Sequence, residues 1–351
     1  MSFPGKSSIA KLGAGLLAWT VSLATSAGMA ATTEGAASPN SANRLSTFRS
    51  KYLENPLAVS LSLEKPSLGM RFKPKSDDGR ATKETWLKPN AHVLWGLGLD
   101  YNGYGAVLAL PLAQDQESVQ RKGSTEHFDL ILHRYWSGGG VDFFFESYKG
   151  FYRSNDGSSG DNDNSTYTQH ADVAAIHTGL NYYYVFSPDR YNIDVQVRER
   201  PNPVYAGLSG GSLIALLALD YNKVSATSPF LKVEDGAGAI DSHDLILAGE
   251  FSTATVGGGY GYTFIRGSHS VRGQLLMGLG PQQQHLTSLD RTETTRTMTA
   301  TKANLSSDYA FFWRNNIFGV NVRYDDLRTN LSSYEMSTTV TSVFFYGLWR
   351  I

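Results

Sequence analysis

The chain has 351 residues, with 31 Lys and Arg against 32 Asp and Glu, so its formal net charge is −1. A balanced charge without a long basic run argues against nucleic acid as a partner. The absence of cysteine excludes disulfides, thiolate metal sites and a cysteine nucleophile. Glycine (35), tyrosine (19) and phenylalanine (17) are abundant, as in a sheet that meets lipid on one face and has aromatic residues at the interfaces.

The first 30 residues have the pattern of a secretory signal peptide. Lys6 and Lys11 form a basic start, and residues 12–24 form an apolar stretch before several small residues. We therefore predict export and removal of this segment. Residues 31–56 are small and polar, which predicts a flexible periplasmic lead-in. No later apolar run approaches the roughly 20 residues of a membrane helix, so only a closed barrel could span a bilayer.

Two-residue alternation of apolar and polar residues predicts strands with one face in lipid. Val93, Trp95 and Leu97 share one face of the segment 91–101, and His92 lies on the other. We expect the apolar face to meet lipid and the polar face to meet the lumen. The expected strands are 57–73, 91–101, 104–113, 124–136, 141–154, 170–187, 190–222, 244–266, 269–286, 300–314, 317–328 and 336–351.

Loop lengths favour an outer-membrane barrel. Tight turns are expected at Asn102-Gly103, 137–140, 187–189, 267–268 and 315–316. They alternate with long polar stretches such as 286–301, and short periplasmic turns alternating with longer extracellular loops are typical of outer-membrane barrels. To keep this alternation, residues 190–222 must form one strand that is interrupted at 201–211. We therefore predict an all-β fold, a single antiparallel transmembrane β-barrel of about 12 strands over residues 57–351.

Aromatic clusters at two places predict interface girdles. Tyr148, Phe151 and Tyr152 lie beside basic residues that could extend to the headgroups. The tyrosines at 182–184 have the same character. We expect both groups to face the membrane interface.

One cluster of polar residues is a candidate lumenal site. His127, Asp129 and His133 share a strand face, because residues two apart point the same way. If the next strand turns its phenylalanines to lipid, Asp142 and Glu146 lie beside them. His92 is a sixth candidate. Imidazoles and carboxylates could bind a divalent metal or carry protons, or they could simply pair with one another across strands, as in many polar barrel interiors. We expect no resident metal or cofactor.

A possible nucleophile lies at Ser209. The segment Gly207-Leu208-Ser209-Gly210-Gly211 formally fits the G-x-S-x-G elbow of hydrolases. A strand rather than a helix is expected to follow, and a base must come from a histidine elsewhere in the chain. We expect the small residues to allow a bend instead, so no enzyme activity is predicted.

Several short motifs are distributed along the chain: Lys88-Pro89-Asn90, Gly123 with Phe128 and Asp129, Asp142 with Tyr148-Lys149-Gly150-Phe151-Tyr152, Asn181 with Tyr184 and Phe186, and Ser209-Gly210-Gly211-Ser212. Through these motifs the chain resembles a bacterial envelope family known as domain of unknown function 4421. The resemblance implies an outer-membrane barrel and no particular activity.

Two function classes remain open from the sequence, with a third more distant. The barrel is either a narrow channel or transporter for small polar solutes, selective through its lumenal residues, or a non-conducting structural or loop-binding barrel filled by its own side chains. A barrel-embedded lipid hydrolase at Ser209 is the third. All three place the protein in the outer membrane of a Gram-negative bacterium, with outer-membrane lipid as a partner.

Overall fold

The computed structural model describes residues 57–74, 84–90, 92–112, 115–136, 138–154, 167–193, 209–229, 245–313, 316–331 and 334–350. The predicted signal peptide and the lead-in at 31–56 lie outside the described residues. No helix in the described part of the chain is long and apolar enough to cross a membrane.

The described chain consists of thirteen strands and one short helix. Their bounds are β1 Leu57–Pro74, β2 Thr85–Lys88, β3 Leu94–Tyr101, β4 Tyr104–Pro111, α3 Gln116–Lys122, β5 Glu126–Trp136, β6 Gly139–Ser154, β7 Thr168–Val185, β8 Gly210–Ser225, β9 Ile246–Arg266, β10 His269–Ser288, β11 Glu293–Trp313, β12 Asn316–Asn330 and β13 Tyr334–Arg350.

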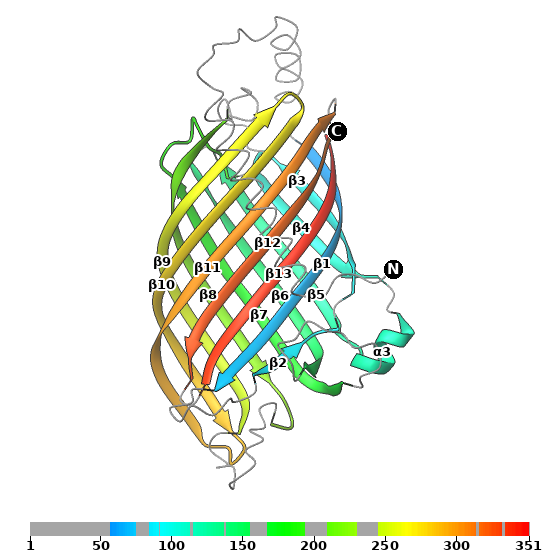
Figure 1. Ribbon diagram of the computed structural model, residues 1–351, viewed down its shortest axis with the longest axis vertical. Helices are drawn as coiled ribbons and strands as arrows, with labels where there is room; N and C mark the ends of the chain where they lie inside the picture. Colours follow the sequence, from blue (N-terminus) through cyan, green and yellow to red (C-terminus); the bar gives the residue numbers. More distant parts are fainter. Residues whose placement is uncertain are drawn as a thin grey trace, which may run out of the picture.

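The strands close into an antiparallel barrel (Figure 1). Each strand from β3 to β13 pairs with the next, β1 pairs with β3, and β13 pairs back with β1 from Ala58↔Arg350 to Pro74↔Tyr334. Closure joins the first and last strands of the described ring, so neither remains an edge strand, which is what a sheet needs in hydrocarbon. The predicted all-β barrel is confirmed, with twelve strands in the ring and β2 added beside it.

The hairpin turn at Asn102-Gly103 shows how local chemistry sets the register. Both residues have positive φ, 50° and 82°, the conformation that a two-residue hairpin turn of type I′ requires. A Cβ on Gly103 would lie 2.4 Å from the carbonyl oxygen of Tyr135, so glycine is needed there for space as well as for φ. The turn predicted at this position is confirmed.

The strand expected at 190–222 is only partly right: its part after the predicted interruption lies in β8, but its beginning at 190–193 is not a strand. Strand β8 begins only at Gly210, while Tyr191 and Ile193 lie in the connection after β7 and are buried, 0% and 7% exposed. The Tyr191 hydroxyl donates to Oε1 of Gln274 on β10, at 3.0 Å. Apolar side chains that fill one end of the lumen alternate with polar ones just as lipid-facing side chains do, which explains the error.

The loop expected at 286–301 is also wrong. Strand β11 begins at Glu293, and β10 and β11 pair continuously from His269↔Phe311 to Thr287↔Glu293. The outward side chains of this part of β11 include Thr295 and Thr297, which are exposed. A hairpin whose outer face is polar lacks the apolar alternation by which strands are recognised, so the sequence indicates a loop.

Strand β2 and helix α3 were not predicted, and they complete one side of the wall. Strand β3 pairs with β1 only as far as Glu64↔Leu94, although β1 continues to Pro74. Beyond this point β2 pairs with both β1 and β6, at Arg71↔Trp86 and Lys88↔Tyr152. Helix α3 lies next to β2 (Figure 1).

Asn90, in the Lys88-Pro89-Asn90 phrase, ties β2 to α3. Its Nδ2 donates to the carbonyl oxygens of Ser118 (3.2 Å) and Gly123 (2.8 Å), and its Oδ1 accepts from the Ser118 hydroxyl at 2.9 Å. Its backbone N–H donates to the Thr125 hydroxyl, at 2.9 Å. The phrase therefore has a structural role, in fixing the segment that follows β4.

Asn90→Ala is expected to release α3 without unfolding the barrel. Three side-chain hydrogen bonds are lost, each worth about 0.5–1.5 kcal/mol, and α3 has no buried residue to hold it otherwise. Trypsin should then cut after Arg121 or Lys122 at least several-fold faster than in the wild type, while the barrel keeps its compact migration on unheated gels. Equal cleavage rates would show that other contacts hold α3.

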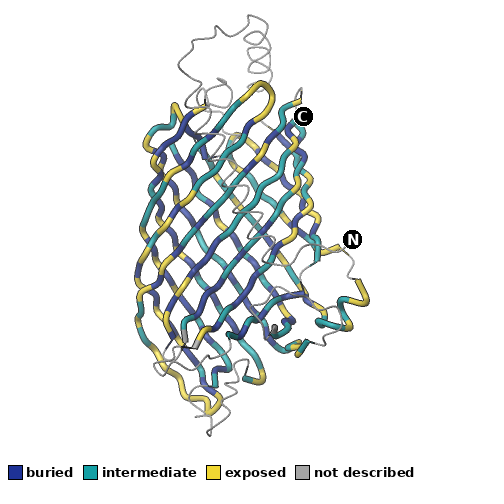
Figure 2. The backbone as a smooth tube through the Cα atoms, viewed as in Figure 1, coloured by how far each residue is buried: buried dark blue, intermediate teal, exposed yellow. Residues whose placement is uncertain are grey.

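Buried residues alternate with more exposed ones along the strands around the barrel (Figure 2). On β3, Trp95, Leu97 and Leu99 are 40%, 44% and 53% exposed, whereas Leu94 is buried. The outward positions predicted for Trp95 and Leu97 are confirmed, and an apolar row with this much exposure is suited to lipid. Val93 and His92 precede the strand.

The predicted aromatic girdles are only partly right. Tyr148 and Phe151 point inward and are buried, as is Tyr183. Tyr182 and Tyr184 are exposed on the outer wall near the tight turns. At 182–184 alternation places neighbouring rings on opposite faces, whereas at 148–152 the bulge at Gly150 puts both Tyr148 and Phe151 on the inner face, so neither run faces the interface as a whole.

The barrel interior is filled by two larger apolar clusters near its ends and by a small third one, which consists of Ala58, Ala310, Ile317 and Leu348. The loop-end cluster, on the side of the long loops, comprises Leu68, Met70, Phe72, Leu87, Tyr148, Phe151, Val173, Ala175, Val224, Ile246, Phe251, Leu286, Leu331, Met336 and Val340. The turn-end cluster comprises Tyr183, Val185, Tyr191, Ile193, Ile214, Leu216, Ala218 and Leu276. Ionisable side chains lie between them.

Candidate functional site

A layer of buried ionisable side chains crosses the middle of the lumen. It is built by inward-facing positions of β1, β5, β6, β7, β8, β11 and β12, so residues from both halves of the chain meet. Its members are Glu64, Asp129, Glu146, His177, Asp220, Lys302, Arg323 and Asp325. We call this group the lumenal charge layer.

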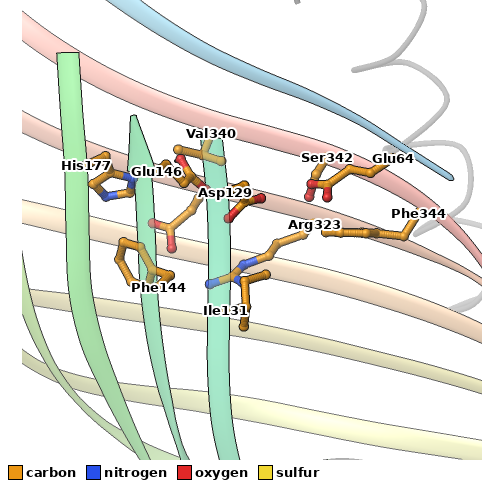
Figure 3. A pocket seen from close by; sticks show the side chains of 11 residues that line it. Glu64, Asp129, Ile131, Phe144, Glu146, His177, Arg323, Val340, Ser342 and Phe344 are labelled. Atoms are coloured by element: carbon orange, nitrogen blue, oxygen red, sulfur yellow. Dashed lines mark hydrogen bonds and ion pairs between the residues drawn. The ribbon is translucent and has the colours of Figure 1, made fainter. Parts of the chain in front are cut away.

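A small cavity lies on one side of the lumenal charge layer. Glu64, Asp129, Glu146, His177 and Arg323 come together around it with several apolar neighbours (Figure 3). Its volume is about 10 Å³, roughly the room that one water molecule requires. Asp129 is 2% exposed, and its Oδ1 has no hydrogen-bond partner among the described residues. The cavity is therefore lined by carboxylates but too small for a solute.

Histidine 177 joins the cavity to the rest of the layer. Its Nδ1 lies 3.4 Å from Oε2 of Glu146, and its Nε2 lies 3.9 Å from Oδ1 of Asp220. The three side chains come from β6, β7 and β8, which are neighbours in the ring. The imidazole thus lies between two carboxylates on adjoining strands.

Lysine 302 crosses the lumen. From β11 its Nζ approaches Oδ1 of Asp220 on β8 at 2.6 Å, Oδ1 of Asn181 on β7 at 3.3 Å and Oδ2 of Asp325 on β12 at 3.7 Å. The lysine side chain is 1% exposed, and so is that of Asp220. Because β8 and β11 are separated in the sheet by two strands, this ion pair spans the interior rather than following the wall.

The six residues predicted for the lumenal site are divided among four places. Asp129 and Glu146 are register partners and line the cavity together. His133 and Asp142 are also register partners, nearer the tight turns. There His133 Nε2 lies 2.8 Å from Oδ1 of Asp100, and the Tyr135 hydroxyl donates to Asp142.

The two remaining predicted residues lie apart from the cavity. His127 stacks on Tyr148, with ring centroids 4.1 Å apart. His92 precedes β3, and its partial burial lowers the pKa of its imidazole. The structure therefore divides the predicted residues into two pairs and two separate histidines rather than one cluster.

Most of the lumenal charge layer was missed from the sequence. Glu64, His177 and Lys302 each occupy an inward position of an expected strand, and this parity is a signal that sequence analysis could have used. The alternation of inward and outward residues alone does not tell how deep a side chain lies along the barrel axis, or which side chain faces it across the lumen. The ion pair of Lys302 with Asp220 needs the ring to be closed before it can be recognised.

The lumenal charge layer contains more carboxyl groups than cations. It contains five carboxyl groups against two permanent cations, Lys302 and Arg323, with His177 as a third when protonated. Within the described residues, no group of three or more His, Asp or Glu side chains is arranged to hold a metal ion.

Ser209 lies at the turn end of the wall, just before β8. Its hydroxyl accepts a hydrogen bond from the backbone N–H of Ile265 at 2.9 Å, so it extends the pairing of β8 with β9. Gly207 and Leu208 of the G-x-S-x-G phrase lie outside the described residues.

The family model for a domain of unknown function (DUF4421) matches residues 46–348, nearly the whole barrel. The chain belongs to this family. The match confirms the resemblance carried by the sequence phrases, and Asn90, one of those residues, has a structural role in this barrel.

Comparison with solved structures finds other outer-membrane barrels, all distantly similar. The outer membrane protease OmpT from Escherichia coli is 9% identical, with 84% of this chain and 96% of that chain covered and a TM-score of 0.39. The β-domain of the Bordetella autotransporter BrkA is 9% identical (84% and 100% covered, TM-score 0.37), and Ail of Yersinia pestis is 13% identical (82% and 97% covered, TM-score 0.23). No curated protein matches the chain.

Proposed function

We propose that this outer-membrane barrel is closed at rest by its own side chains and serves as a structural or loop-binding module. The proposal places the protein in the outer membrane of a Gram-negative bacterium after signal-peptide-directed export, with outer-membrane lipid as its surroundings. The observation that carries it is the filled lumen, in which two apolar clusters enclose the lumenal charge layer. Nucleic acid is not a proposed partner.

The degree of burial along the lumen supports a closed barrel. Leu276 in the turn-end cluster and Leu87 in the loop-end cluster are both 0% exposed, and Lys302 between them is 2% exposed. An open aqueous pore would leave inward side chains in contact with water. A hydrated ion would instead have to displace tightly packed apolar side chains, in which desolvation of a charge is costly.

Purified full-length protein is expected to give no single-channel steps in planar bilayers. A general porin inserted under the same conditions provides the positive control, and heat-modifiable migration on gels shows that the preparation is folded. Reproducible steps from the wild-type protein would overturn the closed-barrel proposal.

A narrow channel for small polar solutes is the second candidate, favoured by the carboxyl excess of the lumenal charge layer. If steps do appear, they should prefer cations. The double variant Asp129→Asn with Glu146→Gln should then lose part of this preference, read as a shift of reversal potential in a salt gradient. An unchanged reversal potential would show that the lumenal charge layer does not determine the ion preference of the conductance.

The proposal includes no hydrolase activity. The bond between the Ser209 hydroxyl and the backbone of Ile265 supports a role in strand pairing. A Ser209→Ala change should leave any lipid-hydrolysing activity of a purified preparation unchanged. A loss of such activity in this variant would instead favour a nucleophilic serine.

A further inference from the structure

The outward residues of β1 and β6 change from apolar to basic toward the long loops. Outward positions of β1 are apolar at Leu61 and Leu63, whereas Lys65 and Lys73 are basic and exposed. On β6 an outward phenylalanine at 145 is followed by Lys149. The basic residues lie beyond the apolar band, at the end of the barrel opposite to the tight turns and to the carboxyl end of β13. In outer-membrane barrels, that side is extracellular.

Strand β2 and helix α3 add cations and aromatic rings at this level. The Arg71 guanidinium and the Lys88 ammonium lie 5.3 Å and 5.6 Å from the centroid of the Trp86 ring. The Lys122 ammonium lies 5.5 Å and 5.4 Å from the rings of Tyr152 and Tyr167, which are 5.1 Å apart. We call these six residues the basic aromatic belt: Arg71, Trp86, Lys88, Lys122, Tyr152 and Tyr167.

The group around Trp86 lies next to the group around Tyr152 and Tyr167. Lys88 and Tyr152 are register partners on β2 and β6, so their side chains project from the same outer face. Arg71 also hydrogen-bonds Glu84, through Nε to Oε2 at 2.9 Å, and this bond lowers the pKa of Glu84. The aromatic rings and this carboxylate position the cations at the surface.

The charge of this region differs from that of the whole chain. The described segments 65–73, 84–90, 115–126 and 149–153 contain eight Lys and Arg but four Asp and Glu, whereas the chain as a whole has 31 and 32. A local excess of cations directly beyond an apolar band suits an anionic lipid headgroup. Tyrosine and tryptophan beside them suit the same interface.

We propose that the basic aromatic belt binds the phosphate groups of a phosphorylated glycolipid in the outer leaflet. This inference rests on the proposed outer-membrane placement and does not depend on whether the lumen conducts. The lysine ammonium groups of Lys88 and Lys122 approach the phosphates, the rings lie against the sugar, and the acyl chains follow the apolar surface below.

The test is a titration of purified, folded protein in detergent micelles with diphosphoryl lipid A, read by native mass spectrometry. The double variant Lys88→Gln with Lys122→Gln should bind about 30-fold more weakly, from the loss of two headgroup-level cations. The double variant Lys88→Arg with Lys122→Arg keeps both charges and should bind nearly as the wild type does. Compact migration on unheated gels shows that each variant is folded.

Lys223→Gln is the matched control. Lys223 also faces outward at the loop end, but it lies on β8, outside the belt, where its Nζ pairs with Oε1 of Glu250 at 2.6 Å, so its removal should leave lipid A binding unchanged. Equal binding of dephosphorylated lipid A would show that acyl chains alone are recognised and would overturn the proposal. Displacement of lipid A by inorganic phosphate alone would assign the belt to a soluble anion and would also overturn it.

Discussion

Replacing Lys302 by methionine is expected to destabilise the folded barrel by about 3–5 kcal/mol, the usual cost of removing one partner of a buried ion pair. The change removes the cation that lies 2.6 Å from Asp220 and 3.7 Å from Asp325. The Lys302 side chain is 1% exposed, so water cannot replace the ammonium. Methionine keeps most of the volume, which separates the loss of charge from a cavity.

The measurement is equilibrium unfolding by urea in detergent micelles, followed by the loss of compact gel migration. Lys223→Met is the matched control, since it removes an exposed ion pair with Glu250 that should contribute only about 0–1 kcal/mol. Adding Asp220→Asn to Lys302→Met should recover part of the loss, because one uncompensated carboxylate is removed with it. A loss from Lys302→Met no larger than that of the control would show that the lumen is wet at this level.

Leu97→Arg is expected to cost about 2–4 kcal/mol, the penalty for an arginine on the lipid face near the bilayer midplane. Leu97 is 44% exposed on the outer wall and pairs with Leu61 and Leu108 on its neighbouring strands. The arginine would therefore meet hydrocarbon on every side.

Gln283→Arg provides the control for the lipid-face prediction. Gln283 is also exposed and outward, but it lies on β10 beyond the apolar residues Leu275, Met277 and Leu279. At that level the cost should be about 0–1 kcal/mol. The same urea titration in lipid vesicles reads both variants. Equal costs would contradict the position assigned to the membrane band.

The candidate site shows why the two-residue alternation in the sequence predicted only some of the contacts between lumenal side chains. It placed Asp129 and Glu146 together because they lie on neighbouring strands joined by a short turn, and the structure pairs them. It could not relate Lys302 to Asp220, which are 82 residues apart and face each other across the lumen. Contacts along the wall follow from turn length, whereas contacts across the lumen depend on the diameter and closure of the ring.

The amino-acid sequence by itself determined the barrel and the lipid-facing rows such as Trp95 and Leu97, because a two-residue period and turn chemistry are local properties of the chain. Only the tertiary structure decided what fills the lumen. Tyr191 and Ile193 enter one end of it from a connection that resembles a strand, and the lumenal charge layer forms from seven strands. Inward side chains meet only when the ring closes, so neither their depth nor their partners are encoded in any single segment.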